Sequence, residues 1–303
     1  MRRIALIGYG EVGRSLARDL RAKGIDDLVA FDVAFADPAS RASRAAAEDR
    51  TPVAESTAAA VRDADLVFDA VTAGSALDAA GAIAAAIAAA IATTGPRGAF
   101  VVDMNSVAPA TKVAAAERVE AAGGRYVEAA VMSPWPPRGL RTPLLLGGPH
   151  AAAFLGAAGA LDLDAQVYAD RIGPASSVKM CRSIMVKGVE AIAMECVTAA
   201  DAYGVLDDVL ASLKDLFPGI VWTDKAGYLT SRALIHGRRR AEEMREVCRT
   251  IEDAGFEPVM TRSTVVVQDR AADIGATLDR AKVEPGDLAA ILAMLRDRRG
   301  RRD

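Results

Sequence analysis

A glycine-rich hexapeptide near the N-terminus restricts the fold of this chain more than any other part of its sequence. It reads Gly-Tyr-Gly-Glu-Val-Gly, directly after an apolar run at residues 4–7 and at the start of an amphipathic segment. In a strand–turn–helix unit, the first glycine permits the tight turn, the second lets the backbone approach a pyrophosphate, and the third lets helix and strand pack closely. Unpaired N–H groups at the start of that helix attract an anion. We therefore predict that a nucleotide binds at Gly8, Tyr9, Gly10, Glu11, Val12 and Gly13.

An acidic residue follows at the spacing that this type of nucleotide site requires. Asp32 ends the apolar run at residues 28–31 and lies 19 residues after Gly13, close to the spacing of about 20 expected for a ribose-binding acid. A carboxylate accepts hydrogen bonds from both ribose hydroxyls and repels the 2′-phosphate of NADP. No arginine follows at Val33 or Ala34 to neutralise it. We predict NAD rather than NADP, with SAM or FAD as the alternatives that share such a fingerprint.

Strand and helix signals alternate through the first half of the chain and predict an α/β fold, with a doubly wound parallel sheet of Rossmann type. The predicted strands are residues 3–7, 28–31, 66–69, 100–103, 125–129 and 144–147, and the predicted helices are 11–22, 39–48, 56–62, 77–92 and 108–121. From Pro174 the strand signals disappear, and a helix of about 30 residues is expected to reach Gly204. We predict two domains, a nucleotide-binding Rossmann domain at residues 1–170 and an all-helical substrate and dimerisation domain at 171–303.

The composition of the chain excludes several classes of protein. Lys and Arg number 37 and Asp and Glu 40 in 303 residues, a net charge of -3 that provides no overall field to attract nucleic acid or an anionic membrane. Residues 79–96 carry no charge, but alanine gains too little from lipid to make a convincing membrane span. Three cysteines without close spacing predict reduced core thiols and no metal site. We expect a cytoplasmic protein that binds neither nucleic acid nor a membrane.

Three segments together resemble the β-hydroxyacid dehydrogenases, a family that includes 3-hydroxyisobutyrate and 6-phosphogluconate dehydrogenases. They are the N-terminal fingerprint, Asp-Met-Asn-Ser-Val-Ala-Pro at residues 103–109, and Gly-Pro-Ala-Ser-Ser-Val-Lys at residues 173–179. The resemblance covers nearly the whole chain, and it is closest to an uncharacterised branch of 6-phosphogluconate dehydrogenase-like oxidoreductases. It implies NAD(P)-dependent oxidation of a 3-hydroxy acid and a homodimer formed through the helical domain. Such a dimer is expected to bury Met180, Ile184, Val189, Ile192 and Val197.

The same resemblance assigns roles to individual residues. Lys179 matches the catalytic lysine of the family, which takes the hydroxyl proton as hydride leaves the carbinol carbon and returns it in the reverse direction. Ser106 matches a hydroxyl that touches substrate and nicotinamide, and Asn105 is expected to contact the cofactor from the preceding position. Val71 and Thr72 match the segment that passes beside the adenosine side of the cofactor.

One face of the long helix is expected to line a substrate cleft. Lys179, Arg182 and Ser183 stand at positions i, i+3 and i+4, so all three can face the same side. Arg182 and Ser183 replace a His-Asn or Asn-Asn pair of the family, and we expect Arg182, together with Arg138, to bind the substrate carboxylate in a bidentate clamp. The alternative for Arg182 is a salt bridge to a nearby acid. Lys187, two turns further along, is predicted to be an ordinary surface lysine.

A second segment departs from the family pattern. The family's Asp-Ala-Pro-Val-Ser-Gly-Gly appears here as Glu-Ala-Ala-Val-Met-Ser-Pro at residues 128–134, so Met132 takes the serine position unless a slip of one residue gives that place to Ser133. Ser133 is our candidate for substrate binding. Proline has no N–H, so the proline-rich loop cannot offer the run of backbone donors that would hold a carboxylate. Trp135 is expected to add an aromatic wall and to suit a substrate larger than hydroxyisobutyrate.

His236 lies roughly where the family has a cleft-facing Lys-Asp pair, and it is a candidate contact for substrate or a partner subunit, with a capping or surface role as the alternative.

Together these features predict an NAD-dependent dehydrogenase of a small or medium 3-hydroxy acid. An imine reductase resembles the same fold, but such enzymes generally replace the lysine found here as Lys179 with an acid or a tyrosine. A non-catalytic NAD(H)-sensing protein would need the Rossmann half without Lys179, Ser183 and Ser106 converging on one cleft.

Overall fold

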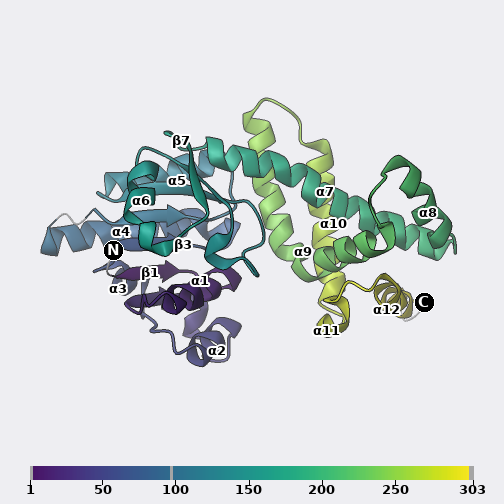
Figure 1. Cartoon of the computed structure of the whole chain (residues 1–303), viewed down its shortest axis with the longest axis horizontal. Helices are drawn as coiled ribbons and strands as arrows, with labels where there is room; N and C mark the ends of the chain where they lie inside the picture. The colour runs from purple at the N-terminus through teal and green to yellow at the C-terminus, as the bar shows by residue number, and fades with distance from the viewer. Residues whose placement is uncertain (1–2, 96–97, 300–303) are drawn as a thin grey trace. The chain divides into compact units, whose positions relative to one another are not determined.

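The structure is a computed structural model that describes residues 3–95 and 98–299 (Figure 1). Contacts divide the chain into two compact units, Met1–Met180 and Cys181–Asp303. The division falls inside the long helix α7 (Pro174–Ala202), so the first turns of this helix belong to unit 1. The boundary predicted after residue 170 lies shortly before this helix.

Unit 1 contains one seven-stranded sheet in the order β2-β1-β3-β4-β5-β6-β7. Its strands are β1 (Ile4–Ile7), β2 (Leu28–Phe31), β3 (Leu66–Asp69), β4 (Phe100–Asp103), β5 (Arg125–Val131), β6 (Leu144–Gly147) and β7 (Ala165–Ala169). Neighbouring strands are parallel except β5 and β6, which pair antiparallel. The predicted Rossmann sheet is therefore confirmed as a mostly parallel sheet whose last two strands run against the others.

Helices cover both faces of this sheet because its central strands are buried on both sides. In β1, Ile4 and Leu6 face one hydrophobic cluster, and Ala5 and Ile7 face the other. The first cluster includes residues of α1 (Glu11–Ala22), α2 (Arg41–Glu48) and α6 (Ala151–Ala157), and the second includes residues of α3 (Thr57–Val61), α4 (Ala76–Thr94) and α5 (Pro109–Ala121). Short 3₁₀ turns stand at Val33–Ala36, Ala73–Ser75, Gly139–Arg141 and Gly159–Leu161.

Within the part of the chain that the structure describes, one helical segment, Ala73–Thr93, is long and apolar enough to cross a membrane, with a mean hydropathy of 1.8. About a third of the tested window, 33%, is buried inside the protein. Ala80, Ile83 and Ile87 of this segment pack into the second cluster beside the sheet. Packing of this kind is typical of the core helix of an α/β unit.

One strand and one α-helix of unit 1 were not predicted from the sequence. β7 is an edge strand whose central residues, Gln166, Val167 and Tyr168, are exposed, so it lacks the apolar alternation that marks a buried strand. The seven-residue helix α6 precedes it and has only two buried residues, Ala151 and Phe154. The predicted strands and helices otherwise agree with the structure to within two residues at each end.

Unit 2 is helical, as predicted. Besides the remainder of α7 it contains α8 (Leu206–Leu216), α9 (Trp222–Asp253), α10 (Val259–Gly275), α11 (Arg280–Val283) and α12 (Leu288–Arg299). Two apolar clusters hold these helices together, one around Leu234 and Ile291 and one around Val197 and Leu292. The 29 residues of α7 agree with the expected length of that helix.

The surface of unit 2 corrects two expectations. The three cysteines are free, but none lies in a core, because Cys181 is exposed and Cys196 and Cys248 are half-buried. Of the apolar residues expected to need a second subunit, Met180 and Val197 are buried by their own chain. Val189 and Ile192 of α7 are exposed, as is Met185 beside them.

Candidate functional site

The glycine fingerprint forms the predicted turn between β1 and α1. Gly8 has a φ of +91°, and a Cβ atom there would lie 2.4 Å from the carbonyl oxygen of Ala70. A Cβ on Gly13 would lie 2.0 Å from the carbonyl oxygen of Gly8, so only glycine lets α1 start this close to the strand. Gly10 is exposed, with nothing within 4 Å of its Cβ position, and no side chain caps α1 there. The backbone is therefore open to a pyrophosphate group at the helix N-terminus.

This turn lies where the strand order of the sheet reverses. β1 has β2 on one side and β3 on the other, and in such sheets ligands bind outside the carboxyl ends of the two strands at the reversal. Backbone hydrogen bonds hold the neighbouring strand ends together, 2.8 Å from Gly8 N to Phe31 O and 2.9 Å from Ala70 N to Ile7 O. Half-buried Val71 and exposed Thr72 follow directly. A Cβ atom on Gly8 would lie 3.2 Å from Cγ1 of Val71, so Val71 lies beside the fingerprint. Contact of Val71 and Thr72 with a cofactor stays a prediction.

Asp32 is held with its carboxylate towards the same turn. Its Oδ2 accepts a hydrogen bond of 2.7 Å from the backbone N–H of Tyr9, and its Oδ1 accepts one of 2.8 Å from the backbone N–H of Ala34. Each carboxylate oxygen keeps acceptor capacity for a ribose hydroxyl, because a carboxylate offers about four lone-pair positions. Val33 is 82% exposed, so the strand end leaves room beside the carboxylate.

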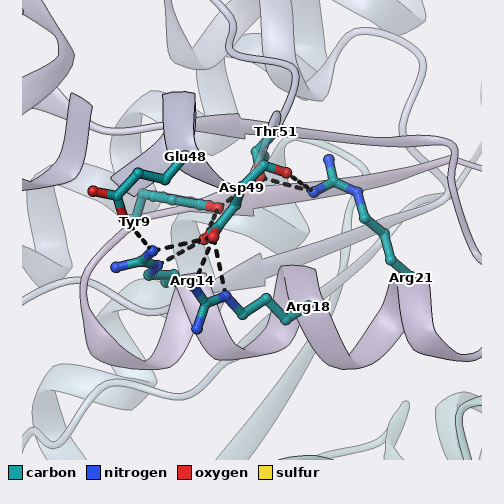
Figure 2. A network of polar contacts seen from close by, with 7 residues as sticks. All are labelled: Tyr9, Arg14, Arg18, Arg21, Glu48, Asp49 and Thr51. Carbon is teal, nitrogen blue, oxygen red and sulfur yellow. Dashed lines mark hydrogen bonds and ion pairs between the residues drawn. The ribbon is translucent and has the colours of Figure 1, made fainter. Parts of the chain in front are cut away.

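The side chain of Tyr9 points away from the turn into a network of charges (Figure 2). Its ring is 2% exposed, and its hydroxyl shares a hydrogen bond of 2.6 Å with that of Thr51. Asp49, next to it, accepts hydrogen bonds of 2.7 Å from Arg14 Nε and from Arg18 Nη2. The bond from Arg14 is the main cause that lowers the pKa of Asp49 to about 2, with Arg18 adding to it and burial opposing it. The network ties the first turns of α1, and with them the fingerprint, to the end of α2.

Asn105 joins the loop after β3 to the loop after β4. Its Oδ1 accepts a hydrogen bond of 2.7 Å from the backbone N–H of Val71, and its Nδ2 donates one of 2.9 Å to Oδ2 of Asp69. The residue is buried, and both ends of its amide are occupied by the protein. The geometry gives Asn105 the task of positioning Val71, while direct contact with a cofactor stays a prediction.

A buried acid and lysine lie beneath these loops, and sequence reasoning missed both. Asp103 Oδ1 accepts a hydrogen bond of 2.7 Å from Lys112 Nζ, and its Oδ2 accepts one of 2.6 Å from the hydroxyl of Tyr126. Neighbouring Asp69 is also buried, and its Oδ1 has no hydrogen-bond partner among the described residues. Burial raises the pKa of Asp69 well above its usual value, and the negative charge of Asp103 raises it further. A lysine among the apolar positions of α5 is the only sequence signal of this cluster.

Two of the predicted residues of unit 1, Ser106 and Lys179, lie on separate segments. Ser106 is half-buried in the loop between β4 and α5, and Lys179 is half-buried in the second turn of α7. The start of α7 is held by Glu128 of β5, which is fully buried. Its Oε2 accepts a hydrogen bond of 2.7 Å from the backbone N–H of Gly173, and its Oε1 accepts one of 2.6 Å from that of Ser176. In the sequence, Glu128 is visible only as a departure from the family pattern.

The proline-rich loop differs from its predicted role in one respect. Trp135 is 3% exposed and belongs to the first hydrophobic cluster, so its ring is a core side chain and not an exposed aromatic wall. Ser133 is half-buried, and its hydroxyl oxygen has no hydrogen-bond partner among residues 3–95 and 98–299. Arg138 is exposed. Substrate binding at Ser133 stays a prediction.

In unit 2, the prediction for Lys187 is wrong. This lysine is 8% exposed, and its Nζ lies 2.7 Å from Oε2 of Glu243 and donates a hydrogen bond of 3.0 Å to the hydroxyl of Ser183. The other oxygen of Glu243 accepts from Arg239 at 2.7 Å. Ser183 is buried beside this pair, whereas Arg182 is exposed. The sequence places Ser183 and Lys187 one turn apart, but their acidic partner comes from α9 and cannot be read from that spacing.

His236 lies in the middle of α9, so the capping alternative is wrong. The ring is half-buried. Burial lowers the pKa of His236 to about 3, and the neighbouring positive charges contribute. These charges belong to Arg232, Arg239, Arg240 and Arg280. A neutral imidazole is therefore expected across the physiological pH range, and its contact with substrate stays a prediction.

Two family models match the chain. Residues 3–134 match the NAD binding domain of 6-phosphogluconate dehydrogenase, and residues 200–271 match a domain of unknown function, DUF1932. A curated relative, an uncharacterised 28.5 kDa protein of Methanothermus fervidus, is 31% identical over 99 residues, or 33% of this chain. The match spans 39% of the length of that relative.

Solved structures extend the likeness over the whole chain. A conserved hypothetical protein from Sinorhizobium meliloti 1021 is 32% identical, with 97% of each chain covered and a TM-score of 0.65. A conserved protein of unknown function, described as structurally similar to 3-hydroxyacid dehydrogenases, is 29% identical over 89% of this chain and 97% of its own, with a TM-score of 0.63.

More distant structures share the fold alone. The 3-hydroxyisobutyrate dehydrogenase of Mycobacterium tuberculosis is 18% identical over 93% of this chain and 98% of its own, with a TM-score of 0.67. An imine reductase of Streptomyces aurantiacus is 18% identical over 97% of this chain and 99% of its own, with a TM-score of 0.52.

Proposed function

The chain belongs to the family that joins the NAD-binding domain of 6-phosphogluconate dehydrogenase to DUF1932, and on that premise we propose that it is an NAD-dependent oxidoreductase of a 3-hydroxy acid. The observation that carries the proposal is the turn between β1 and α1. Gly8 and Gly13 admit no side chain, Gly10 opens onto free space, and the start of α1 has no side-chain cap. These features fit a dinucleotide pyrophosphate.

The choice of NAD over NADP rests on Asp32. Its carboxylate is fixed by the backbone N–H groups of Tyr9 and Ala34, so it is not free to swing aside for a 2′-phosphate. A phosphate next to this charge would suffer repulsion that a ribose hydroxyl does not. Arg14 and Arg18 are paired with Asp49, so their charges are partly neutralised.

Lys179 is the proposed general base. When bound, NAD supplies the acceptor for the hydride that leaves the carbinol carbon. The substrate hydroxyl then loses its proton to Lys179 Nζ, and the ammonium returns this proton when the reaction runs in reverse. Lys179 is half-buried in the second turn of α7. Ser106 is proposed to orient the substrate hydroxyl from the loop after β4.

The remaining predicted residues belong to the same proposal. Ser133, Arg182, Ser183 and His236 are proposed to contact the substrate, and Arg182 is exposed on α7. We also propose a homodimer, supported by the exposed apolar residues Met185, Val189 and Ile192 on α7. A cytoplasmic location is proposed as well, supported by three free cysteines.

The test is NADH formation, with NADP in parallel, across 3-hydroxy acids that differ in size, 2-substituent and a second acidic group. Lys179→Met should lower the rate with the best substrate by roughly two to four decades and leave NADH binding intact, because the change removes only the proton acceptor. Lys214→Met, at an exposed lysine of α8, is the matched control. An unchanged rate in Lys179→Met would refute the lysine mechanism.

Two alternative functions are outcomes of the same experiment. Silence with every hydroxy acid, together with reduction of cyclic imines by NADH or NADPH, would indicate an imine reductase, a class that shares this fold. NADH binding without turnover of either substrate class would indicate a nucleotide-sensing protein.

A further inference from the structure

Glu128 is a buried charge with an unusual set of partners. Within the described ranges 3–95 and 98–299, its side chain makes no salt bridge to a lysine or arginine. Its two oxygens instead accept the backbone N–H groups of Gly173 and Ser176, at 2.7 and 2.6 Å. Taking a carboxylate out of water without a cation beside it is strongly unfavourable. A chain that keeps one here must compensate through these two bonds.

The compensation comes from the N-terminus of α7. Gly173 and Ser176 bracket the first turn of a helix of 29 residues, where the N–H groups have no partner within the helix. Such a terminus carries a partial positive charge of about half an elementary charge. Hydrogen bonds from it to a carboxylate are charge-assisted and stronger than neutral ones. Glu128 therefore caps α7 from a neighbouring strand, a role that a residue before the helix usually performs.

A glycine at position 147 leaves space for the carboxylate of this cap. Gly147 of β6 pairs with Glu128 across the sheet, and a Cβ atom on Gly147 would lie 2.4 Å from Glu128 Oε2. A Cβ atom on Gly173 would lie 3.6 Å from Cβ of Pro109, the first residue of α5. The capped end of α7 thus adjoins the segment that begins with Asp103 and contains Ser106. Both lie in unit 1.

We propose that Glu128 is a positioning residue for Lys179. It fixes the first turn of α7 beside the end of the sheet where the Ser106 loop follows β4. This inference rests on the proposed function, in which Lys179 exchanges a proton with the substrate. Ser176, which donates to Glu128, precedes Lys179 by three residues, or about one helical turn. A shift or rotation of the first turn therefore moves the Lys179 amine directly. A displacement of about 1 Å at a reacting group can lower a rate about a hundredfold.

Two variants break the cap from opposite sides. Glu128→Gln keeps the shape of the side chain but turns an NH₂ group towards one of the two backbone donors. Ser176→Pro keeps Glu128 and removes one donor at a helix position where proline is tolerated. Ser176→Ala is the matched control, because it removes the Ser176 hydroxyl, which donates to Gly173 O at 3.0 Å, and retains the N–H group.

The expected result has two parts. Glu128→Gln and Ser176→Pro should lower kcat about tenfold to a hundredfold with the dissociation constant of NADH unchanged, whereas Ser176→Ala should stay within about twofold of the unaltered protein. Hydrogen–deuterium exchange of peptides covering residues 171–180 should rise in the first two variants and not in the third, in the absence of any substrate. The exchange measurement needs no activity, so it tests the cap even if the proposed reaction is wrong.

Three outcomes would overturn the inference. Unchanged exchange in both variants would show that Glu128 does not hold the start of α7. Raised exchange with unchanged kcat would show that the cap does not position the lysine. Loss of kcat accompanied by an equal loss of NADH affinity would indicate general damage to unit 1. If Glu128→Gln does not fold, Ser176→Pro and Ser176→Ala decide the question alone.

Discussion

Replacing Asp49 with asparagine should weaken unit 1 by an amount that depends on pH. The carboxylate accepts from Arg14 and Arg18 at 2.7 Å each, and both guanidinium groups lose their charged partner in Asp49→Asn. Because these arginines stand on α1 behind the fingerprint, the change acts on the support of the nucleotide turn and not on the turn itself. We expect a less stable unit 1 that still binds NADH.

The size of the effect follows from the pKa. Arg14 is the main cause that lowers the pKa of Asp49 from 3.8 to about 2, a difference of about 1.8 units and thus of about 2.4 kcal/mol before screening. The side chain of Arg18 is 57% exposed, so solvent reduces the interaction and we expect a loss of about 1 to 1.5 kcal/mol at pH 7. A lowered pKa stabilises the folded state above the unfolded value and ceases to do so as pH falls through about 2. About half of the difference between the two proteins should therefore be gone at pH 3.

Urea unfolding followed by tryptophan fluorescence measures this loss in unit 1 alone. The chain has two tryptophans, and Trp222→Phe leaves Trp135 in the core of unit 1 as the reporter. Asp26→Asn removes an exposed carboxylate from the same unit and serves as the control, with an expected change below about 0.5 kcal/mol. A loss that is equal at pH 7 and pH 3 would refute the reasoning, because the effect would then not come from the charge of Asp49.

Two further predictions concern buried charges. Burial raises the pKa of Asp69, so the folded state retains a proton that the unfolded chain releases above its pKa of 3.8, and folding stability should fall as pH rises beyond that value. Asp69→Asn should remove this decline, and urea midpoints from pH 4 to 8 that keep the slope of the unaltered protein would contradict it. In unit 2, Lys187→Met should destabilise the fold by about 3 kcal/mol, because it removes from buried Glu243 the cation that lies 2.7 Å from its Oε2. Unfolding followed by Trp222 fluorescence checks this, and a loss of unfolding free energy below about 1 kcal/mol would contradict a stabilising role for the buried Lys187–Glu243 pair.

Local patterns in the sequence predicted the elements of unit 1 well. The glycine fingerprint requires a strand before it and a helix after it, and α1 begins at Glu11 and ends at Ala22 as expected. Asp32 followed from a fixed spacing in the same unit. The edge strand β7 was missed because exposure on both sides removes the alternation on which the prediction depends.

Contacts between a charged side chain and a partner far along the chain could not be predicted in the same way. Arg14 and Asp49 are 35 residues apart, and Gly173 and Glu128 are 45 residues apart. Nothing local distinguishes Lys187, which is buried against α9, from a lysine on a solvated helix face. Burial of a charge depends on which elements pack together, so it becomes visible only once the tertiary structure is known. The cap formed by Glu128, the ion pair of Arg14 with Asp49 and the buried acid Asp69 are therefore visible only in the three-dimensional structure.

The bonds of Asp32 limit how cofactor preference can change in this protein. The carboxylate that we propose to bind the ribose also caps the 3₁₀ turn at Val33–Ala36 through Ala34 and fixes the backbone of Tyr9 inside the fingerprint. A mutation that removes it to admit a phosphate also leaves two backbone donors without their acceptor. A change to NADP use must therefore supply both a cation for the phosphate and a new acceptor for these two backbone donors. Replacing Asp32 alone would not supply both, so several substitutions are required together.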